Sequence, residues 1–187
     1  VFNRFDPEMK VEVFIEDGTP VKPGDVAMVV EGKIQSLLQT ERLMLNIMQR
    51  MSGIATMTAR YVKKVEGTGT RVLDTRKTTP GMRILEKMAV KIGGGCNHRI
   101  GLFDMILLKD NHVDFAGGIH NAVTRAKEYC KDTRKAVEIV AGRCETESSG
   151  GITYETMLPY AQAGVDFISF GALTHSVKGL DMSFKAC

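Results

Sequence analysis

The sequence predicts an α/β fold in which short parallel strands alternate with helices. Two observations predict it. From about Arg71 onward, short apolar runs alternate with segments of helical periodicity, and nearly every apolar run ends at a charged or glycine-rich loop. The chain has 187 residues, of which 43% are hydrophobic, so it is long enough to bury a core of its own. Strict alternation of this kind favours a parallel sheet or a β/α barrel.

The first 65 residues predict two strands and a long helix. Apolar and polar residues alternate over 11–15, and a second apolar run follows at 26–30. Thr40 is in a position to cap a helix. Gly53 lies inside that helix and predicts a bend or break there. The apolar residues at helical spacing are Met44, Ile47, Met48, Met51, Ile54 and Ala55.

The remainder predicts four short strands that alternate with helices. Pro80 suits the first turn of a helix, because its missing N–H has no partner there. The predicted strands are 71–73, 105–108, 144–147 and 165–170. One predicted helix begins at Pro80, and two others cover 121–130 and 154–163.

Composition excludes several functional classes. The net charge of +3 is too small to indicate nucleic-acid binding, and no apolar stretch approaches the roughly 20 residues of a membrane span. Four cysteines show no C-x-x-C pair, which predicts free thiols in a reducing cytoplasm and no metal site built from them. The first residues resemble neither a signal peptide nor a protein start, so we expect the chain to begin within a longer protein. The common nucleotide-binding and hydrolase motifs are absent from the sequence.

Polar clusters follow the predicted strands at the point where each strand ends. They come after Leu73, Leu108, Glu147 and Phe170. In a β/α barrel the carboxyl ends of the strands converge on one mouth, and active sites are built there. The sequence therefore predicts one site assembled from four separate segments.

The region from Asp74 to His112 is rich in positive charge. Arg83, Lys87 and Lys91 are predicted to lie on the solvated face of the helix that follows Pro80. The other four cations abut a strand end or a glycine run, where they predict a pocket for a small polyanion, because they would repel one another without an anion. These cations are Arg76, Lys77, Arg99 and Lys109.

Glycine-rich loops predict the phosphate-binding part of the site. Ser149-Gly150-Gly151 and Gly171-Ala172 follow two successive late strands, which is where barrels often bind phosphate. The run 93–95 predicts a sharp turn or a close approach to ligand, and places His98 as a hydrogen-bond donor to phosphate. The residues alone therefore indicate a barrel-like enzyme that binds a phosphorylated and carboxylated ligand.

Several longer motifs resemble those of quinolinate phosphoribosyltransferases, in the family's order and over nearly the whole chain. They are ER (41–42), QRMSGIAT (49–56), DTRKTTPG (74–81), GGGCNHRIGL (93–102), KDNH (109–112), SGGI (149–152) and GALTHS (171–176). The resemblance implies an incomplete β/α barrel over 66–187 and part of an N-terminal α/β sandwich domain, with its connecting helix, over 1–65. The C-terminal tail would return to that first domain.

The resemblance also implies the reaction. Phosphoribosyl would pass from phosphoribosyl pyrophosphate to quinolinate with decarboxylation, giving nicotinate mononucleotide, pyrophosphate and carbon dioxide in NAD biosynthesis. Mg²⁺ would bind through the substrate pyrophosphate. The protein would be cytoplasmic and a homodimer with shared sites, or a higher oligomer of dimers, without nucleic-acid or membrane partners.

By the same resemblance, Lys77 and Lys109 would be catalytic, and Arg42 would enter the site of a neighbouring subunit. The substrate-binding residues would be Arg42, Thr75, Arg76, Lys77, His98, Arg99, Lys109, Ser149, Gly150, Gly151, Gly171 and Ala172. No metal-ligating residue is assigned.

The chain differs from the family where two acidic motifs are expected. A strand of the type V-E-V-E-V and a later L-D-N, whose acids contact ribose and magnesium-bound pyrophosphate in the family, are both missing. Glu138 lies in a segment better read as the helix that follows L-D-N. These differences predict a break in the chain near Lys131 and Asp132. They also leave two alternatives: a related enzyme for another aromatic acid, or a non-catalytic barrel that binds phosphate and carboxylate.

Overall fold

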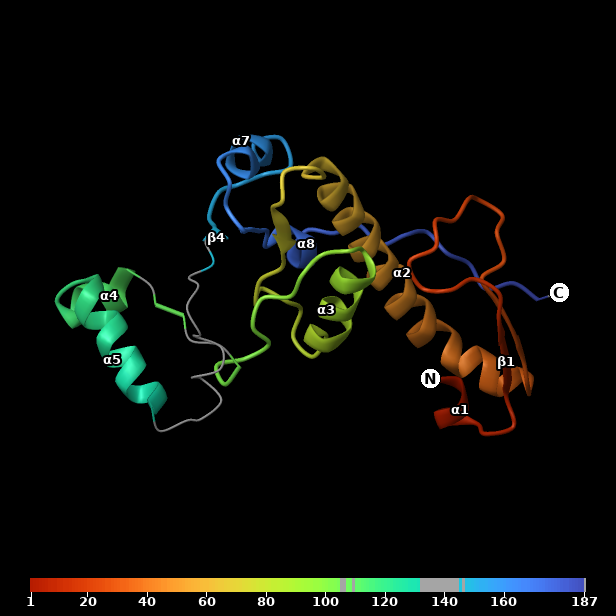
Figure 1. The fold of residues 1–187 in the computed structure, drawn as a ribbon. Helices are drawn as coiled ribbons and strands as arrows, with labels where there is room; N and C mark the ends of the chain where they lie inside the picture. Colours follow the sequence, from red (N-terminus) through yellow and green to blue (C-terminus); the bar gives the residue numbers. More distant parts are fainter. Residues whose placement is uncertain (105–106, 109, 132–144, 146, 187) are drawn as a thin grey trace.

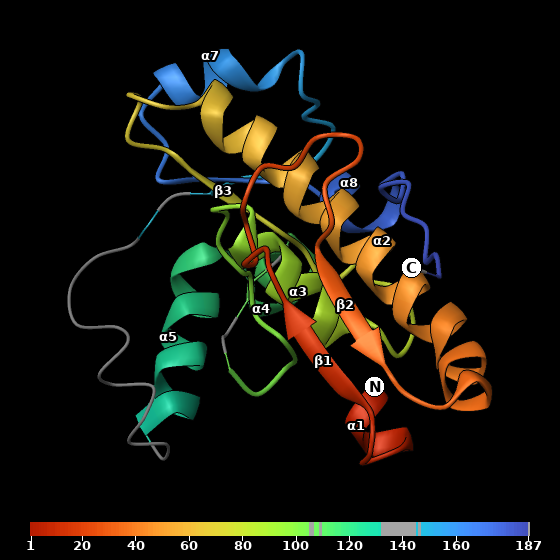
Figure 2. The same ribbon diagram turned by 90° about the vertical axis from the view of Figure 1, so that its right-hand side faces the viewer.

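The structure, a computed structural model, describes residues 1–104, 107, 108, 110–131, 145 and 147–186 (Figure 1). Its N-terminal part comprises helix α1 (Phe2–Phe5), strands β1 (Lys10–Val13) and β2 (Met28–Glu31), and the 31-residue helix α2 (Ile34–Lys64). The two strands are antiparallel, and Figure 2 shows them beside the N-terminal half of α2. The predicted strands at 11–15 and 26–30 are confirmed in kind, each displaced by one or two residues.

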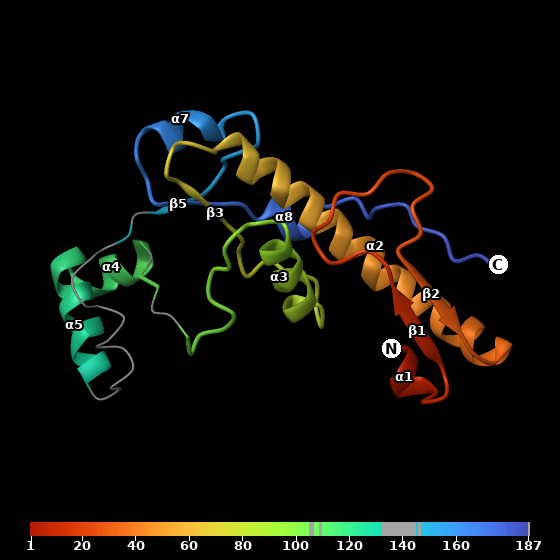
Figure 3. The same ribbon diagram turned by 45° about the vertical axis from the view of Figure 1, so that its right-hand side comes forward.

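The second part contains a three-stranded parallel sheet with helices around it (Figure 3). Its order is β3-β5-β4, so β5, the last of the three strands along the chain, lies in the middle of the sheet. An isolated parallel bridge from Leu73 to Cys96 adds a fourth position beside β3. The elements are β3 (Arg71–Leu73), α3 (Arg83–Ile92), α4 (Asp110–Ala116), α5 (Ile119–Lys131), β4 (Glu147–Ser148), α7 (Met157–Gln162), β5 (Phe167–Ser169) and α8 (Ala172–His175).

Two hydrophobic clusters hold these parts together, and α2 contributes to both. The larger packs the C-terminal half of α2 against the parallel sheet and includes Ile54, Tyr61 and Phe170. The smaller joins the N-terminal half of α2 to α1 and to the C-terminal tail, where the Phe2 and Phe184 rings stack at 6.5 Å. Helix α2 therefore links the antiparallel hairpin to the parallel sheet, and Figure 1 shows it crossing between them.

Helix α2 departs from two expectations. It begins at Ile34, and Thr40 is no cap: its hydroxyl is buried and donates to the Ser36 carbonyl at 2.7 Å. It also continues through Gly53 without a break. A Cβ atom at Gly53 would collide with the carbonyl oxygen of Lys178, so the glycine lets the C-terminal segment cross the helix closely.

Other boundaries also differ from the prediction. Helix α3 begins at Arg83 and not at Pro80, because residues 80–82 form a turn. The strand predicted at 105–108 is wrong for 107 and 108, which are in no regular element, while 105 and 106 lie outside the described residues. Helix α4 was not predicted.

Helices α4 and α5 pack on each other and stand apart from the rest of the fold in Figures 1 and 3. Phe115 of α4 and Ile119 of α5 are 87% and 69% exposed. Large apolar side chains on barrel helices normally cover strands. Part of the surface that this helix pair would cover is therefore not supplied by the described residues.

Candidate functional site

Four loops meet where the parallel strands end. Leu73 is opposite Ser169 in the sheet and bridges to Cys96 on its other side, while Ser148 is opposite Ile168. Parallel strands bring all their carboxyl ends to one edge. The loops that follow, in order along this edge, are 97–99, 74–77, 170–172 and 149–151. The predicted convergence is confirmed for the clusters that follow Leu73, Glu147 and Phe170, and the loop 97–99 lies beside them. For the cluster predicted after Leu108 there is no such confirmation, because 107 and 108 form no strand and Lys109 lies outside the described residues.

A buried ion pair lies beneath two of these loops. Lys87 of α3 donates from Nζ to Oδ1 of Asp74 at 2.7 Å and to the carbonyl of His98 at 2.8 Å. Asp74 Oδ1 also accepts the backbone N–H of His98 at 2.7 Å. The solvated position predicted for Lys87 is wrong, since the residue is only 2% exposed. Burial raises the pKa of Asp74 above its usual value, and Lys87 opposes that rise.

Arg83 is half-buried and bound to neighbouring loops, whereas Lys91 is exposed as predicted. The Arg83 guanidinium donates to the hydroxyl of Thr78 at 3.0 Å and to the carbonyls of Ile100 and Arg76. A helical periodicity assigns side chains to a face, but long cations reach from that face into neighbouring loops. Arg83 therefore ties α3 to the loops on both sides of it.

His98 is held with a defined tautomer. Its Nδ1 accepts the N–H of Arg99 at 2.8 Å, so the ring proton is assigned to Nε2. Nε2 faces Oε2 of Glu147 at 3.6 Å. Burial lowers the pKa of His98 below 6.5, with Glu147 acting in the opposite direction. A neutral His98 thus presents a donor toward the mouth of the site.

Glu147 is a site residue that the sequence reasoning missed. It was treated as the end of a strand, and only the contact with His98 across the sheet places it at the mouth. The nearest sequence signal was its position directly before the Ser148–Ser149 pair and the glycine loop.

The lowered pKa of His98 predicts how stability depends on pH. The folded state binds the His98 proton more weakly than the unfolded chain does. The contribution of neutral His98 to the free energy of unfolding is therefore complete above pH 6.5. It is lost as the pH falls below 6.5 toward the folded pKa. Urea unfolding at about pH 7.5 and pH 5 measures this, and the His98→Gln variant should lose less stability on acidification than the parent. An equal loss in both proteins would contradict the assignment.

A second ion pair connects α2 with α3, with the loop after β3 and with α8. Arg50 donates to Oε1 of the fully buried Glu86 at 2.6 Å, to the hydroxyl of Thr79 at 2.9 Å and to the carbonyl of Thr174 at 2.6 Å. The Thr174 hydroxyl in turn donates to the carbonyl of Lys77 at 2.8 Å. These bonds fix the loop after β3 against the loop after β5.

The predicted cations of the loop after β3 lie at this edge. Arg76 is half-buried and Lys77 exposed, and within the described ranges no acidic side chain pairs with either. The Lys77 side chain passes over Gly171, since a Cβ there would lie 3.3 Å from Lys77 Cδ. Thr75 shapes the loop, because its hydroxyl accepts the N–H of Lys77 at 3.1 Å. Two cations without acidic partners suit an anionic ligand.

Arg99 and Arg42 occupy contrasting positions. Arg99 is 8% exposed and belongs to the loop fixed by the Asp74–Lys87 pair. Arg42 is on α2 with a 79% exposed side chain, and its ion pair is with Glu41 at 3.5 Å. It lies eight residues before Arg50, or roughly 12 Å along the helix. The structure therefore does not bring Arg42 into the site of its own chain.

The glycine runs divide into two kinds. Ser149, Gly150 and Gly151 are exposed at the mouth, with φ of 94° and 66° for the two glycines. The 93–95 run does not approach a ligand position. A Cβ at Gly93 would collide with the Ala55 carbonyl of α2, so these glycines let α3 pack closely on α2.

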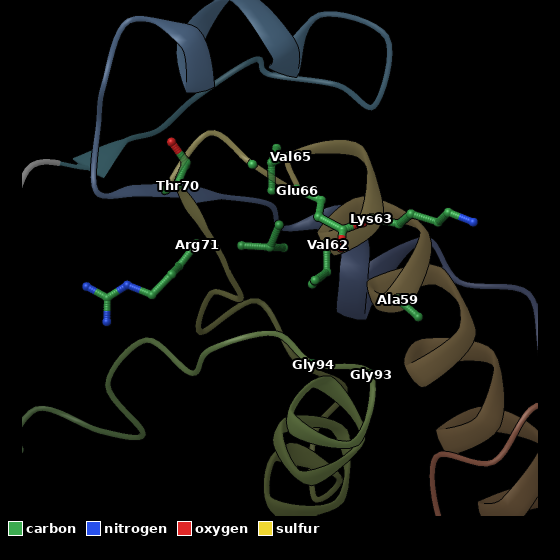
Figure 4. Close-up of a pocket in the computed structure, with 12 residues that line it drawn as sticks. Ala59, Val62, Lys63, Val65, Glu66, Thr70, Arg71, Gly93 and Gly94 are labelled. Carbon is green, nitrogen blue, oxygen red and sulfur yellow. The ribbon is translucent and has the colours of Figure 1, made fainter.

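One hollow in the described part of the chain lies away from this edge. It has a volume of about 460 Å³ and lies between the end of α2 and Gly93-Gly94, with Arg71 in its wall (Figure 4). Arg71 begins β3, whereas Asp74 follows it, so the hollow is at the opposite end of the strand. Its lining offers no convergent cations, and we assign the site to the carboxyl edge.

The described residues do not form a metal centre. No three His, Cys, Asp or Glu side chains are grouped in those ranges so as to hold an ion. Asp74 is engaged by Lys87 and Glu147 faces His98, so neither is arranged as part of an octahedral oxygen cage. Nor is any helix in the described part long and apolar enough to cross a membrane.

Sequence comparisons agree on one family. The profile "Quinolinate phosphoribosyl transferase, N-terminal domain" matches residues 1–52, and the corresponding C-terminal domain profile matches 54–142 and 130–185. A chloroplastic nicotinate-nucleotide pyrophosphorylase [carboxylating] of Arabidopsis thaliana is 40% identical over 237 aligned residues, covering 99% of this chain and 68% of that protein. A probable nicotinate-nucleotide pyrophosphorylase of Bacillus subtilis is 37% identical, covering 97% and 75%.

Solved structures give the same result. NadC from Streptococcus pyogenes superposes with a TM-score of 0.87 at 36% identity, covering 99% of this chain and 78% of that one. The nicotinate-nucleotide pyrophosphorylase from Francisella tularensis gives 0.85 at 36% identity, covering 97% and 77%. The predicted fold class is confirmed by these neighbours. This chain belongs to the quinolinate phosphoribosyltransferase family.

Proposed function

We propose that the chain transfers phosphoribosyl from phosphoribosyl pyrophosphate to quinolinate with decarboxylation, giving nicotinate mononucleotide, pyrophosphate and carbon dioxide. The observation that carries the proposal is the row of four loops at one sheet edge. Cations lie at one end of this row and open glycine loops at the other. Relatives that cover nearly the whole chain carry the names of enzymes for this reaction.

Each end of the row suits one substrate. Arg76 and the His98–Arg99 pair, together with Lys109, would bind the two quinolinate carboxylates and turn the ring nitrogen toward the anomeric carbon. Ser149-Gly150-Gly151 and Gly171-Ala172 would hold the ribose phosphate through backbone N–H groups. Lys77 extends over Gly171, between the two ends. There it would stabilise the charge that develops on the departing pyrophosphate.

We further propose that Mg²⁺ reaches the site on the substrate pyrophosphate, because the described residues do not form a cage for it. The cytoplasmic location expected from cysteine usage remains a prediction, and several plant relatives are named as chloroplastic or mitochondrial. We place the boundary between the α/β sandwich part and the barrel part near residue 65, where α2 ends.

Carbon dioxide release tests the function. Quinolinate labelled at its 2-carboxylate is incubated with phosphoribosyl pyrophosphate, with and without Mg²⁺, and nicotinate is assayed in parallel for pyrophosphate release. We expect labelled carbon dioxide only with quinolinate and Mg²⁺ together. Turnover of nicotinate alone would indicate a related enzyme for another acid. Binding of quinolinate without any turnover would indicate a non-catalytic barrel.

Arg42 predicts a homodimer with shared sites. Its exposed side chain lies away from the site of its own chain and is available to a second subunit. Mixing Arg42→Ala protein with Arg76→Ala protein should restore about a quarter of the parental rate, because half the exchanged dimers hold one intact site. Activity of the mixture is measured after subunit exchange has been shown by mass spectrometry. No recovery after exchange would argue against shared sites.

We propose that the family's missing strands belong between α5 and β4. The alignment with the Arabidopsis protein spans 237 residues against 187 here, and the C-terminal profile matches in two pieces that meet at 130–142. Phe115 of α4 and Ile119 of α5 are also left exposed by the described residues. Asp132, on the far side of this junction, lies outside the described residues, and so does Glu138. A crystal structure should place the Lys131 and Asp132 Cα atoms much farther apart than the ~3.8 Å of a peptide link, and a normal separation would refute the break.

A further inference from the structure

Asp74 and Lys87 form an ion pair inside the protein, although neither was expected to be part of the site. Their exposed fractions are 0% and 2%, and Nζ and Oδ1 are 2.7 Å apart. Removing two charges from water costs free energy that their attraction often does no more than offset. An apolar pair of similar volume would fill the same space. Global stability therefore gives no sufficient reason for charges at these two positions.

The bonds around the pair show what the charges do. Lys87 donates to the carbonyl oxygen of His98, while Asp74 accepts the N–H of the same residue. Both polar groups of one peptide segment are thus bound to one buried pair. Asp74 directly follows β3 and Lys87 lies on α3, so the clamp is anchored in two elements of the core. Charge-assisted bonds of this kind are stronger than neutral ones.

The Asp74–Lys87 clamp fixes the backbone from which the side chains of His98 and Arg99 extend toward the site. The His98 backbone fixes the ring whose Nδ1 binds the Arg99 N–H, and it fixes the direction in which Nε2 points. Arg99 follows in the same segment. The glycine loops at 149–151 and 170–172 are not bonded to the pair. A loosened clamp would therefore displace His98 and Arg99 without displacing the phosphate loops.

We propose that the Asp74–Lys87 pair is a positioning pair that clamps the backbone of His98 and thereby sets the affinity for the dicarboxylate substrate. This inference rests on the proposed function only for the identity of that substrate. The pair does not touch the substrate. It acts through His98 and Arg99, and its effect should be confined to one of the two substrates.

The test compares Lys87→Met with Lys91→Met, an exposed lysine one turn further along the same helix. In the Lys87→Met protein the KM for quinolinate should rise at least about tenfold, while the KM for phosphoribosyl pyrophosphate stays within about twofold. The control should change neither. An unchanged quinolinate KM in folded Lys87→Met protein, or an equal rise in both KM values, would overturn the proposal.

A second readout does not need catalysis. The His98 amide should exchange with deuterium faster in Lys87→Met than in the parent or in Lys91→Met, because its acceptor has lost its cationic partner. Unchanged exchange would also overturn the clamp. A parent protein that shows no turnover but passes this exchange test would sink the proposed function and leave the clamp standing.

The double variant Asp74→Asn/Lys87→Met covers the case in which Lys87→Met does not fold. It buries no unpaired charge, keeps an acceptor for the His98 N–H and loses the donor to the His98 carbonyl. A quinolinate KM raised at least about threefold is still expected, since one of the two backbone bonds is gone. A parental KM in this folded double variant would refute the proposal.

Discussion

Replacing Arg76 with alanine is expected to lower kcat/KM by about 30-fold to 1,000-fold while the protein stays folded. Within the described ranges the guanidinium has no acidic partner, and its loop lies at the edge where the four strand-end loops meet. The loss of one charge-assisted contact to a developing or bound anion costs about 2–4 kcal/mol in the transition state. Steady-state kinetics with both substrates measure the loss, and circular dichroism checks the fold.

Lys109→Ala is expected to have an effect of the same size if that residue reaches the mouth as its sequence position predicts.

Arg60→Ala is the matched control for Arg76→Ala, because Arg60 is an exposed arginine of α2 that lies over Tyr154 and outside the loops of the site. Its kcat/KM should stay within about twofold. Near-normal turnover of Arg76→Ala would contradict the assignment of the anion site to this loop.

The convergence of the site could be predicted because it depends on short local patterns. An apolar run followed by a polar cluster marks the carboxyl end of a strand, and parallel strands place these ends together. This was enough to bring Arg76, His98 and the glycine loops to one edge without knowing a single contact. The class of fold was predictable for the same reason.

Contacts between distant segments were not predictable from such patterns. Lys87 was assigned to the solvated face because it falls with Arg83 and Lys91 on the polar side of the helix after Pro80, yet its ammonium reaches Asp74, thirteen positions earlier. Gly53 looked like a helix breaker because the crossing of Lys178 lies 125 residues further along the chain. The same limit concealed Glu147. A residue acts through its neighbours in space, and periodicity describes only its neighbours in sequence.

The Arg50–Glu86 pair shows how much of the fold's stability such a distant contact can hold, and Arg50→Met should reduce the free energy of unfolding by about 3–5 kcal/mol. Glu86 is fully buried, so the substitution leaves a carboxylate inside the protein without its cation, and the Thr79 hydroxyl and Thr174 carbonyl lose a donor as well. For a chain of this length the loss corresponds to a melting temperature lower by roughly 6–20 °C.

The double variant Arg50→Met/Glu86→Gln should recover most of that loss, because it removes the unpaired buried charge. The amide oxygen introduced at position 86 can still accept the N–H of Thr79. Arg60→Met, a change of the same kind at an exposed site on α2, should cost less than about 1 kcal/mol. Denaturant unfolding of the four proteins measures all three differences. If Arg50→Met were no less stable than Arg60→Met, the buried carboxylate would not depend on Arg50. The link from α2 through Thr174 to the Lys77 loop would then have to be carried by packing alone.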